Sequence, residues 1–361
     1  MNPRWPAVWA ARARVARAPD EPGLSLALAP MDGVTDAVYR ALLTDQAGGE
    51  SGVSLCVSEF VRVTGAAVPA HVIRKHCPEV DAGGRTAAGV PVFVQLLGGA
   101  PAPMAATAAR AAELGAPGID LNFGCPAKTV NRHDGGATLL KAPARILEIV
   151  RAVRDAVPPR VPVTVKIRIG WDSGDSLEAI AAAAEEGGAA WLTIHARTRA
   201  QGYKPPVHWH ALARARAAVR SLPLVANGDV RTVDDLAACA HATHCEAFMI
   251  GRGAMGAPTL FRQARDPRVP PLSMPAFAEL LLRYFERLVA AGATEPRALC
   301  RVKQWLRMGA EARPEIAWLF AAIKVRPAWP PARDLLRAVA DGLEPWAAAS
   351  LRVASGSERS A

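Results

Sequence analysis

One cysteine of this 361-residue chain stands where a thiol could do chemistry. Cys125 lies in the segment NFGCP, directly after an apolar run, and the polar segment KTVNRHDGGATLL follows it. A thiol on such a loop can act as a nucleophile or as an acid. The other five cysteines fall in predicted strands, helices or flanking segments, where packing accounts for them, and none forms a CxxC pair. This usage indicates free thiols in a reducing cytoplasm.

Three further polar residues end predicted strands and could contact a ligand. Lys166 could form a Schiff base or stand as a fixed cation beside a ligand. His195 could donate a hydrogen bond to a carbonyl group or to the same ligand. The carboxamide of Gln95 offers two donor hydrogens and an acceptor, which suit the edge of a planar heterocycle. Each residue type also occurs as a satisfied structural group, so none of the three identifies a reaction alone.

Two glycine-containing loops predict a phosphate site. Asn227, Gly228 and Asp229 follow the seventh predicted strand, and Gly251 and Arg252 follow the eighth. Glycine lets a backbone approach an anion closely, and an arginine adds positive charge. Tight turns alone would also explain the glycines, but their coincidence at these two loops favours a phosphate-bearing ligand.

The elements that would position these residues alternate between strand and helix, which predicts an α/β fold with a parallel sheet. The strand-like runs are LALAPM from residue 26, LCVSEF from 55, VFVQLLG from 92, GIDLNFG from 118, VTVKIRIGW from 163, WLTIHART from 191, LVANGDV from 224 and AFMIGRG from 247. Eight such units match the size of a (β/α)8 TIM barrel. A doubly wound open sheet is the alternative. Polar residues at the carboxyl end of nearly every run favour the barrel, because there these ends meet at one mouth.

A small α-helical bundle domain is predicted after the barrel. We expect the barrel over residues 24–264, a proline-rich linker over 265–275, the helical domain over 276–345 and a flexible tail over 346–361. Helices are expected at 276–291, 297–312, 315–325 and 332–343. On the second of them, one arc holds Ala298, Leu299, Val302, Trp305 and Leu306, and the opposite arc holds Arg297, Arg301, Lys303 and Arg307. With Lys324 and Arg326 on the next helix, this basic face either binds an anion or is simply solvated.

The net charge of the chain indicates which class of binding partner to expect. Forty-three Lys and Arg against thirty-three Asp and Glu give a net charge of +10, and a globular chain this basic is expected to meet an anion, nucleic acid first of all. The longest uncharged stretch, residues 86–109, contains prolines and glycines, so no membrane-spanning segment is expected. Residues 1–23, rich in Ala and Arg, predict a disordered N-terminal extension. We expect a cytoplasmic monomer.

A zinc site could be suspected at the CAHATHC segment, residues 239–245. Its spacing matches no standard ligand set, and it lies at the end of a predicted helix, away from the barrel mouth. We therefore expect no metal.

Eight motifs, in order along the chain, resemble the tRNA-dihydrouridine synthases, flavin enzymes that reduce a uridine of the tRNA D-loop. They are APMDGVTD at residue 29, SEFVRV at 58, VQLLG at 94, DLNFGCPAKTVNRHDGGATLL at 120, VKIRIGWDSGD at 165, HARTRAQGY at 195, ANGDV at 226 and MIGRGAMG at 249. The resemblance extends over residues 24–343. The segments EFVRV, GWDSG and RVKQWL are similar to the bacterial C-type subfamily, whose target is uridine 16.

The resemblance implies FMN as the cofactor and NADPH, or NADH, as the electron donor. The implied flavin-binding residues are Pro30, Met31 and Asp32 along the flavin, Gln95 and Lys166 at the isoalloxazine edge, His195 packed on the same cofactor, and Asn227, Gly228, Asp229, Gly251 and Arg252 around the ribityl phosphate. Cys125 aligns with the catalytic thiol and would give a proton to C5 of the uracil while a hydride reaches C6. Lys166 would stabilise negative charge on the flavin.

The resemblance also implies tRNA as the partner. At the barrel mouth, Arg62, Asn122 and Tyr203 would receive a flipped uridine. On the helical domain, Arg301, Lys303 and Lys324 would hold backbone phosphates, which predicts salt-sensitive binding.

Three other functions compete with this interpretation. An FMN-dependent barrel oxidoreductase acting on a small pyrimidine-like molecule would share the phosphate loops but would have no use for a basic helical domain. A Schiff-base lyase using Lys166 would be colourless. A non-catalytic tRNA-binding module would not need Cys125.

Overall fold

Eight parallel strands close into a barrel in the computed structural model, which describes residues 25–45, 51–127, 131 and 135–344. They are β1 (Ser25–Leu28), β2 (Leu55–Val57), β4 (Val92–Leu97), β5 (Ile119–Asn122), β6 (Val163–Arg168), β7 (Leu192–His195), β8 (Leu224–Asn227) and β9 (Ala247–Ile250). Each strand pairs in parallel with its neighbours, β1 pairs with β9, and β2 pairs with β4, so the ring has no gap. The predicted barrel is therefore confirmed, and the open doubly wound sheet is excluded. The extension predicted over 1–23 and the tail predicted over 346–361 lie outside the described residues.

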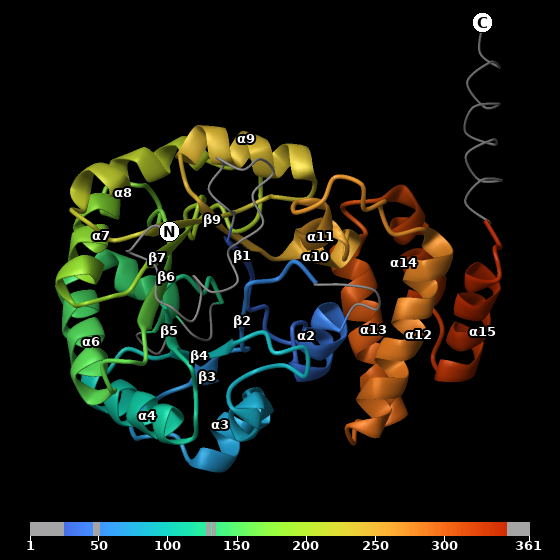
Figure 1. The fold of residues 1–361 in the computed structure, drawn as a ribbon, viewed down its shortest axis with the longest axis horizontal. Coiled ribbons are helices and arrows are strands. Elements are labelled where there is room, and N and C mark those ends of the chain that lie inside the picture. The colour runs from blue at the N-terminus through green and yellow to red at the C-terminus, as the bar shows by residue number, and fades with distance from the viewer. Residues whose placement is uncertain (1–24, 46–50, 128–130, 132–134, 345–361) are drawn as a thin grey trace, which may run out of the picture. The chain divides into compact units, whose positions relative to one another are not determined.

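Helices surround the strands in chain order (Figure 1). They are α2 (Ala37–Thr44), α3 (Ala70–His76), α4 (Pro101–Glu113), α6 (Pro143–Ala156), α7 (Leu177–Glu186), α8 (Leu212–Ala218) and α9 (Val233–Thr243), with short 3-10 turns η1 (Pro78–Ala82), η2 (Gly136–Lys141) and η3 (Trp209–Ala211). The apolar spacing of α6 shows why they cover the sheet: Ile146, Ile149, Val150 and Val153 recur every three or four residues and are all buried.

The second predicted strand, 55–60, ends early in the structure, where a side chain interrupts its ladder. β2 ends at Val57 and β3 (Val61–Arg62) resumes the pairing with β4. Between them, the backbone N–H of Gln95 donates to the hydroxyl oxygen of Ser58 at 3.1 Å, where a continuous ladder would offer a backbone carbonyl. The ladder is therefore interrupted at Ser58, and Arg62 pairs with Leu97, the last residue of β4.

The described residues fall into two compact units. Of these residues, the barrel unit comprises those from Ser25 to Gly251 and Phe261–Arg268, and the second unit comprises Arg252–Leu260 and those from Val269 to Glu344. The second unit contains α10 (Arg252–Gly256), α12 (Met274–Ala290), α13 (Glu295–Gly309), α14 (Pro314–Lys324) and α15 (Trp329–Ala340), and α11 (Leu260–Gln263) lies at its junction with the barrel unit in the sequence. No helix in the described part of the chain is long and apolar enough to cross a membrane.

The helices of the second unit confirm the predicted bundle. All five residues of the predicted apolar arc on α13 are buried. Among them, Trp305 donates its indole N–H to the carbonyl oxygen of Met255 at 2.9 Å and meets the rings of Phe277 and Tyr284 edge-on. The last helix, expected at 332–343, begins three residues earlier, at Trp329. Its prolines, Pro330 and Pro331, fit the first turn, where a backbone N–H has no intrahelical partner.

The six cysteines are all free thiols. Cys56, Cys77, Cys239 and Cys245 are buried, so packing accounts for them as predicted, and Cys125 is half-buried. Cys300 is exposed on α13, so the packing expectation was wrong for this residue. The helix arc that carries it faces away from the bundle core.

Candidate active site

A chain of hydrogen bonds crosses three strands at the carboxyl end of the barrel. The carboxamide N–H of Gln95 donates to Asp120 Oδ2 at 2.7 Å, and Asn122 donates its amide N–H to Gln95 Oε1 at 2.9 Å. The hydroxyl of Thr164 donates to the other oxygen of Asp120 at 2.6 Å. Burial raises the pKa of Asp120, against the lowering effect of these two donors. The network fixes both amide side chains in one orientation.

Lys166 lies beside this chain, one strand further round the barrel. Its partner across the ladder is Asn122. Burial, together with the neighbouring charge of Arg168, lowers the pKa of Lys166 to about 8, although Asp120 and Cys125 oppose the shift. The side chain therefore changes its charge close to neutral pH, which an ordinary lysine does not.

Cys125 follows β5 on a loop that two side chains secure. Asn122 accepts from the backbone N–H of Gly124 at 3.0 Å, and Arg168 donates to the carbonyl oxygen of Gly124 at 3.0 Å. Burial raises the pKa of Cys125, and nearby Asp32 raises it too, while Lys166 and Arg168 lower it. Cys125, predicted to be catalytic, and Lys166 and Asp32, predicted to bind the flavin, thus lie close enough to feel one another's charge.

Arg168 joins the Cys125 loop to the loop after β7. Its guanidinium also donates to the carbonyl oxygens of Thr198 at 3.0 Å and Gly202 at 2.7 Å, and it lies 5.2 Å from the ring centre of Tyr203. The Tyr203 ring is 5.9 Å from the His195 ring and is 55% exposed. Tyr203 is therefore an open aromatic surface at the mouth, next to His195 at the end of β7.

The turn after β8 has the geometry of an anion cradle. Gly228 has φ +132°, and a Cβ there would come within 3.2 Å of the His195 ring. Asn227 donates its side-chain N–H to the carbonyl oxygen of Met249 at 2.7 Å, which joins the ends of β8 and β9. Asp229, at φ +50°, is ion-paired with the fully buried Arg197. Gly228 itself is buried, and its carbonyl oxygen accepts a hydrogen bond from the indole N–H of Trp209 at 2.9 Å, so the turn is held on both sides.

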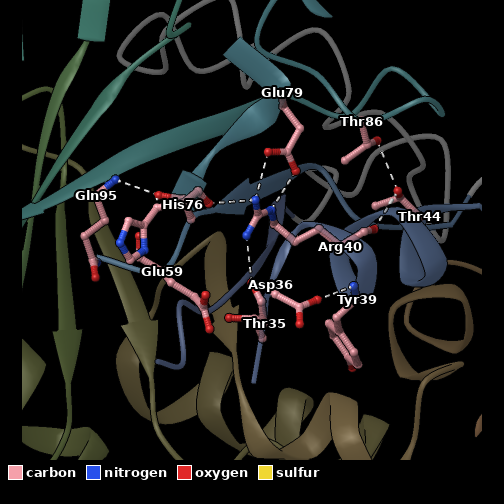
Figure 2. A network of polar contacts seen from close by, with 11 residues as sticks. Thr35, Asp36, Tyr39, Arg40, Thr44, Glu59, His76, Glu79, Thr86 and Gln95 are labelled. Carbon is pink, nitrogen blue, oxygen red and sulfur yellow. Dashed lines mark hydrogen bonds and ion pairs between the residues drawn. The ribbon is translucent and has the colours of Figure 1, made fainter. Parts of the chain in front are cut away.

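A buried ion pair holds the loop after β1 (Figure 2). Arg40 donates through two nitrogens to the carboxylate of Glu79, both at 2.8 Å, and also to the carbonyl oxygens of Thr35 and His76. The hydroxyl oxygen of Thr35 in turn accepts from the backbone N–H of Met31 at 2.7 Å. The two turns at Met31 and His76 are therefore connected through one guanidinium.

Met31 also lies against the loop after β9. A Cβ on Gly251 would come within 3.3 Å of Met31 Sδ and 3.4 Å of Ala29 Cβ. Met31 and Pro30 are half-buried and Asp32 is exposed. Met31 after β1 and Gly251 after β9 are thus neighbours within the barrel unit.

Of the remaining predicted site residues, Arg62 lies at the mouth and four lie in the second unit. Arg62 is exposed at the end of β3. Arg252, predicted to hold phosphate, is ion-paired with Glu311 at 2.7 Å. Arg301 is half-buried on α13, and Lys324 is exposed at the end of α14.

Lys303, the fourth, has a structural role that the helical arc did not reveal. Its ammonium donates to the backbone carbonyl oxygens of Lys324 at 3.2 Å and Arg326 at 2.6 Å. These carbonyls lie at and just beyond the carboxyl end of α14, where a cation is favoured. Lys303 thus joins α13 to the end of α14.

Two positioning residues of the mouth were not among the predicted site residues. Arg168 had a signal, because it is a polar residue at the end of a predicted strand. Arg40 had none, since its partner Glu79 is 39 residues away and both lie in helical or turn segments. Among the described residues, no three metal-ligating side chains gather, at the CAHATHC segment or elsewhere.

Comparison with known proteins agrees with this geometry. A sequence model of the dihydrouridine synthase family matches residues 27–327. The tRNA-dihydrouridine(16) synthase of Pseudomonas putida is 48% identical over 305 residues, which cover 83% of this chain and 93% of the relative. That of Escherichia coli K12 is 42% identical over 301 residues, or 82% of this chain and 93% of the relative.

Solved structures support the fold alone. A 2-naphthoyl-CoA reductase and a histamine dehydrogenase from a Rhizobium species each align with a TM-score of 0.52 at 13% identity. The alignments cover 67% and 70% of this chain, and 50% and 47% of those longer chains. The match to the family model and the identity to its relatives show that this chain belongs to the dihydrouridine synthase family of oxidoreductases.

Proposed function

We propose that this chain is a tRNA-dihydrouridine(16) synthase, which uses FMN and NADPH to reduce the C5=C6 bond of uridine 16 in the tRNA D-loop. The alignment covers more than nine-tenths of the length of the relatives that bear this name. The observation that carries the proposal is the meeting of a half-buried thiol, Cys125, with the low-pKa amine of Lys166 at one barrel mouth.

The residues at the mouth fit a flavin mononucleotide. Gln95 uses one of its two amide hydrogens within the described residues, which leaves the second for a heterocycle edge. Lys166 would give its charge to the same edge. The cradle at Gly228 and the close approach of Gly251 to Met31 suit a phosphate and a thin ring. Bound FMN, once reduced by NADPH, would supply the hydride that C6 of the uracil receives.

Cys125 would hold the proton for C5. Because burial raises the pKa of its thiol, the group stays protonated at neutral pH, as an acid must before the reaction. The positive charges of Lys166 and Arg168 then favour the thiolate that is left when the proton has gone. Solvent would return the proton, since the residue is half-buried and not sealed.

The tRNA contacts are proposed at both units. Asn122, Arg62 and Tyr203 would receive the uridine base at the mouth, where Asn122 is fixed by its bond to Gln95. Arg301 and Lys324 would bind backbone phosphates, and Lys303 would add its charge from its place at the end of α14.

The experiment is to purify the protein, record its absorption spectrum, and then add NADPH and unmodified tRNA, with dihydrouridine mapped by primer extension. A yellow protein that bleaches with NADPH and forms dihydrouridine at position 16 is the expected result. A yellow protein that leaves tRNA unchanged would favour an oxidoreductase of a small pyrimidine-like molecule. A colourless protein that binds no added FMN would refute the flavin assignment.

A further inference from the structure

Two cations lie over one tryptophan ring beside the barrel mouth. Lys141 Nζ is 4.0 Å from the centre of the Trp171 ring, and Arg199 Cζ is 4.4 Å from it. Lys141 ends η2 on the connection after β5, Trp171 is in the loop after β6, and Arg199 is in the loop after β7. Since the carboxyl ends of parallel strands meet at one mouth, three successive mouth loops converge on this ring.

The cluster is a fixed part of the mouth. The backbone N–H of Arg199 donates to the carbonyl oxygen of Gly170 at 2.9 Å, and that of Ala200 donates to the carbonyl oxygen of Trp171 at 2.8 Å. The ring and the Arg199 side chain are half-buried, while Lys141 is exposed. Nε of Arg199 is buried without a hydrogen-bond partner among the described residues. Lys141 is thus open to solvent, whereas Arg199 is held partly inside the rim.

The way in which these charges are held distinguishes them from other cations of the barrel unit. On the outer helices, Arg145, Arg151 and Arg214 each form an ion pair with a glutamate, at 2.9, 3.0 and 2.5 Å. Neither Lys141 nor Arg199 forms an ion pair within the residues that the structure describes. An aromatic face attracts a cation without cancelling its charge, whereas a carboxylate cancels it.

The acidic side chains nearest in sequence, Asp172 and Asp175, do not remove this charge. Both are exposed on the loop that carries Trp171, and Asp175 accepts a hydrogen bond from the hydroxyl of Ser173 at 2.7 Å. Two like charges over one ring repel each other, so an arriving anion relieves a repulsion that the folded protein maintains. The cluster is therefore suited to bind a phosphate.

We propose that Lys141, Trp171 and Arg199 form a tRNA-binding platform that receives a backbone phosphodiester beside the mouth. The inference rests on the proposed function, because it takes tRNA as the anion. Among the anions that the proposed reaction uses, the RNA backbone is the large one that must lie across the rim when a base enters the mouth. Trp171 contacts both cations, so its role in the platform is to hold them.

The test compares tRNA binding by wild-type protein and by Lys141→Gln, Arg199→Gln and the double variant, measured by fluorescence anisotropy over a range of salt concentrations. Arg151→Gln is the matched control, because it removes one charge from the outer face of α6. We expect each single platform variant to bind tRNA about threefold to tenfold more weakly at low salt. The slope of log K against log salt should fall by about 0.7 to 0.9 for each phosphate that a variant no longer neutralises. Arg151→Gln and Lys141→Arg should bind within about twofold of wild type.

A further variant tests whether the placement of the two cations matters in addition to their charge. Trp171→Leu keeps both cations but removes the ring that holds them, and it should weaken binding about twofold to threefold. Unchanged affinity and salt slope in the double variant would overturn the platform. A higher KM for NADPH with unchanged tRNA affinity would also overturn it, and would assign the cations to the phosphates of the dinucleotide. Wild-type protein that binds no tRNA would refute the proposed function and the platform together, whereas equal binding by wild type and double variant would refute the platform alone.

Discussion

The barrel interior has two walls of opposite character. Above its apolar floor, the strands from β4 to β8 point polar side chains inward: Gln95, Asp120, Asn122, Thr164, Lys166, Thr193, His195 and Asn227. The strands β9, β1 and β2 contribute small or aliphatic residues instead: Ala247, Met249, Ala27, Ala29, Leu55 and Val57. One wall can orient hydrogen bonds and charges, and the other can only contact an apolar surface.

This difference teaches how a barrel can bind a ring and act on it. Directional groups are useful only when they are fixed, and on the polar wall Gln95, Asn122 and Thr164 are fixed by one another and by Asp120. Small side chains on the other wall leave room, as the close approach of Gly251 to Met31 shows. A planar cofactor fits between a wall that directs it and a wall that accommodates it, which is the arrangement that the proposed function requires.

The largest effect is expected from Cys125→Ala, at the edge of the polar wall. Loss of a positioned acid lowers the rate of a proton-transfer step by about 10²- to 10⁴-fold, so the rate of dihydrouridine formation should fall by that factor. Absorption of bound flavin should stay unchanged. Cys300→Ala, which removes an exposed thiol from α13, serves as control and should behave like wild type.

Lys166, on the polar wall, should make the rate of tRNA reduction depend on pH. Its ammonium is charged only below its pKa of about 8, so its contribution is full at lower pH and is lost as pH rises through 8. We expect kcat/KM for tRNA reduction to decline above pH 8 in the wild type. Lys166→Arg should abolish this decline, and Lys166→Gln should reduce the rate by roughly tenfold to 100-fold at pH 7. A wild-type profile that stays flat to pH 10 would contradict the assignment.

Substitution of either glycine at the predicted phosphate site should weaken FMN binding, and the loss should be larger at Gly228 than at Gly251. Gly228→Ala places a side chain at φ +132° against Val207 and His195, a strain of about 1–3 kcal/mol, so FMN should bind about tenfold or more weakly. Gly251→Ala has ordinary backbone geometry, and its Cβ would meet the flexible Met31 at 3.3 Å and Ala29 at an ordinary contact distance of 3.4 Å, so a loss of about twofold to threefold is expected. Flavin fluorescence titration measures both, and the reverse order would exclude Gly228 as the cradle.

The smallest effects are expected on stability, where substitutions of two threonines of the polar wall should differ. Thr164→Val removes a donor from the buried Asp120 and should lower the free energy of unfolding by about 1–3 kcal/mol. Thr193→Val removes a buried hydroxyl that has no hydrogen-bond partner among the described residues, so stability should be unchanged or higher by up to about 1 kcal/mol. Denaturant unfolding of the two variants gives the comparison, and equal losses would show that the wall does not depend on its bonds.

The sequence allowed the positions of the polar wall to be predicted, but not its connections. Strand periodicity and the shared direction of parallel strands place Gln95, Lys166 and Asn227 near one mouth, and the structure confirms that these three residues point inward from β4, β6 and β8. Hydrogen-bond partners lie on other strands at separations that no local pattern encodes. Gln95 donates a hydrogen bond to Asp120, which is 25 residues away in the sequence. Arg40 was not predicted because its partner, Glu79, is 39 residues away.

Two local features also escaped prediction because tertiary contacts decide them. The helical period of α13 places Lys303 outward with Arg301, but the end of α14 lies within reach of Lys303 and takes its ammonium. The run LCVSEF, residues 55–60, is a continuous strand by composition, yet the strand ends at Val57, where the Ser58 hydroxyl replaces a backbone acceptor. In both cases a side chain satisfies backbone groups that secondary structure alone would leave without a partner.

The most direct test of the account separates the two halves of the reaction in Cys125→Ala under anaerobic conditions. NADPH should bleach the bound flavin at the wild-type rate, because the thiol has no part in that step. Unmodified tRNA should then restore flavin absorbance about 10²- to 10⁴-fold more slowly than in wild type, since C5 of the uracil lacks its acid. Restoration by tRNA at the wild-type rate would contradict the assignment of Cys125 as the proton donor.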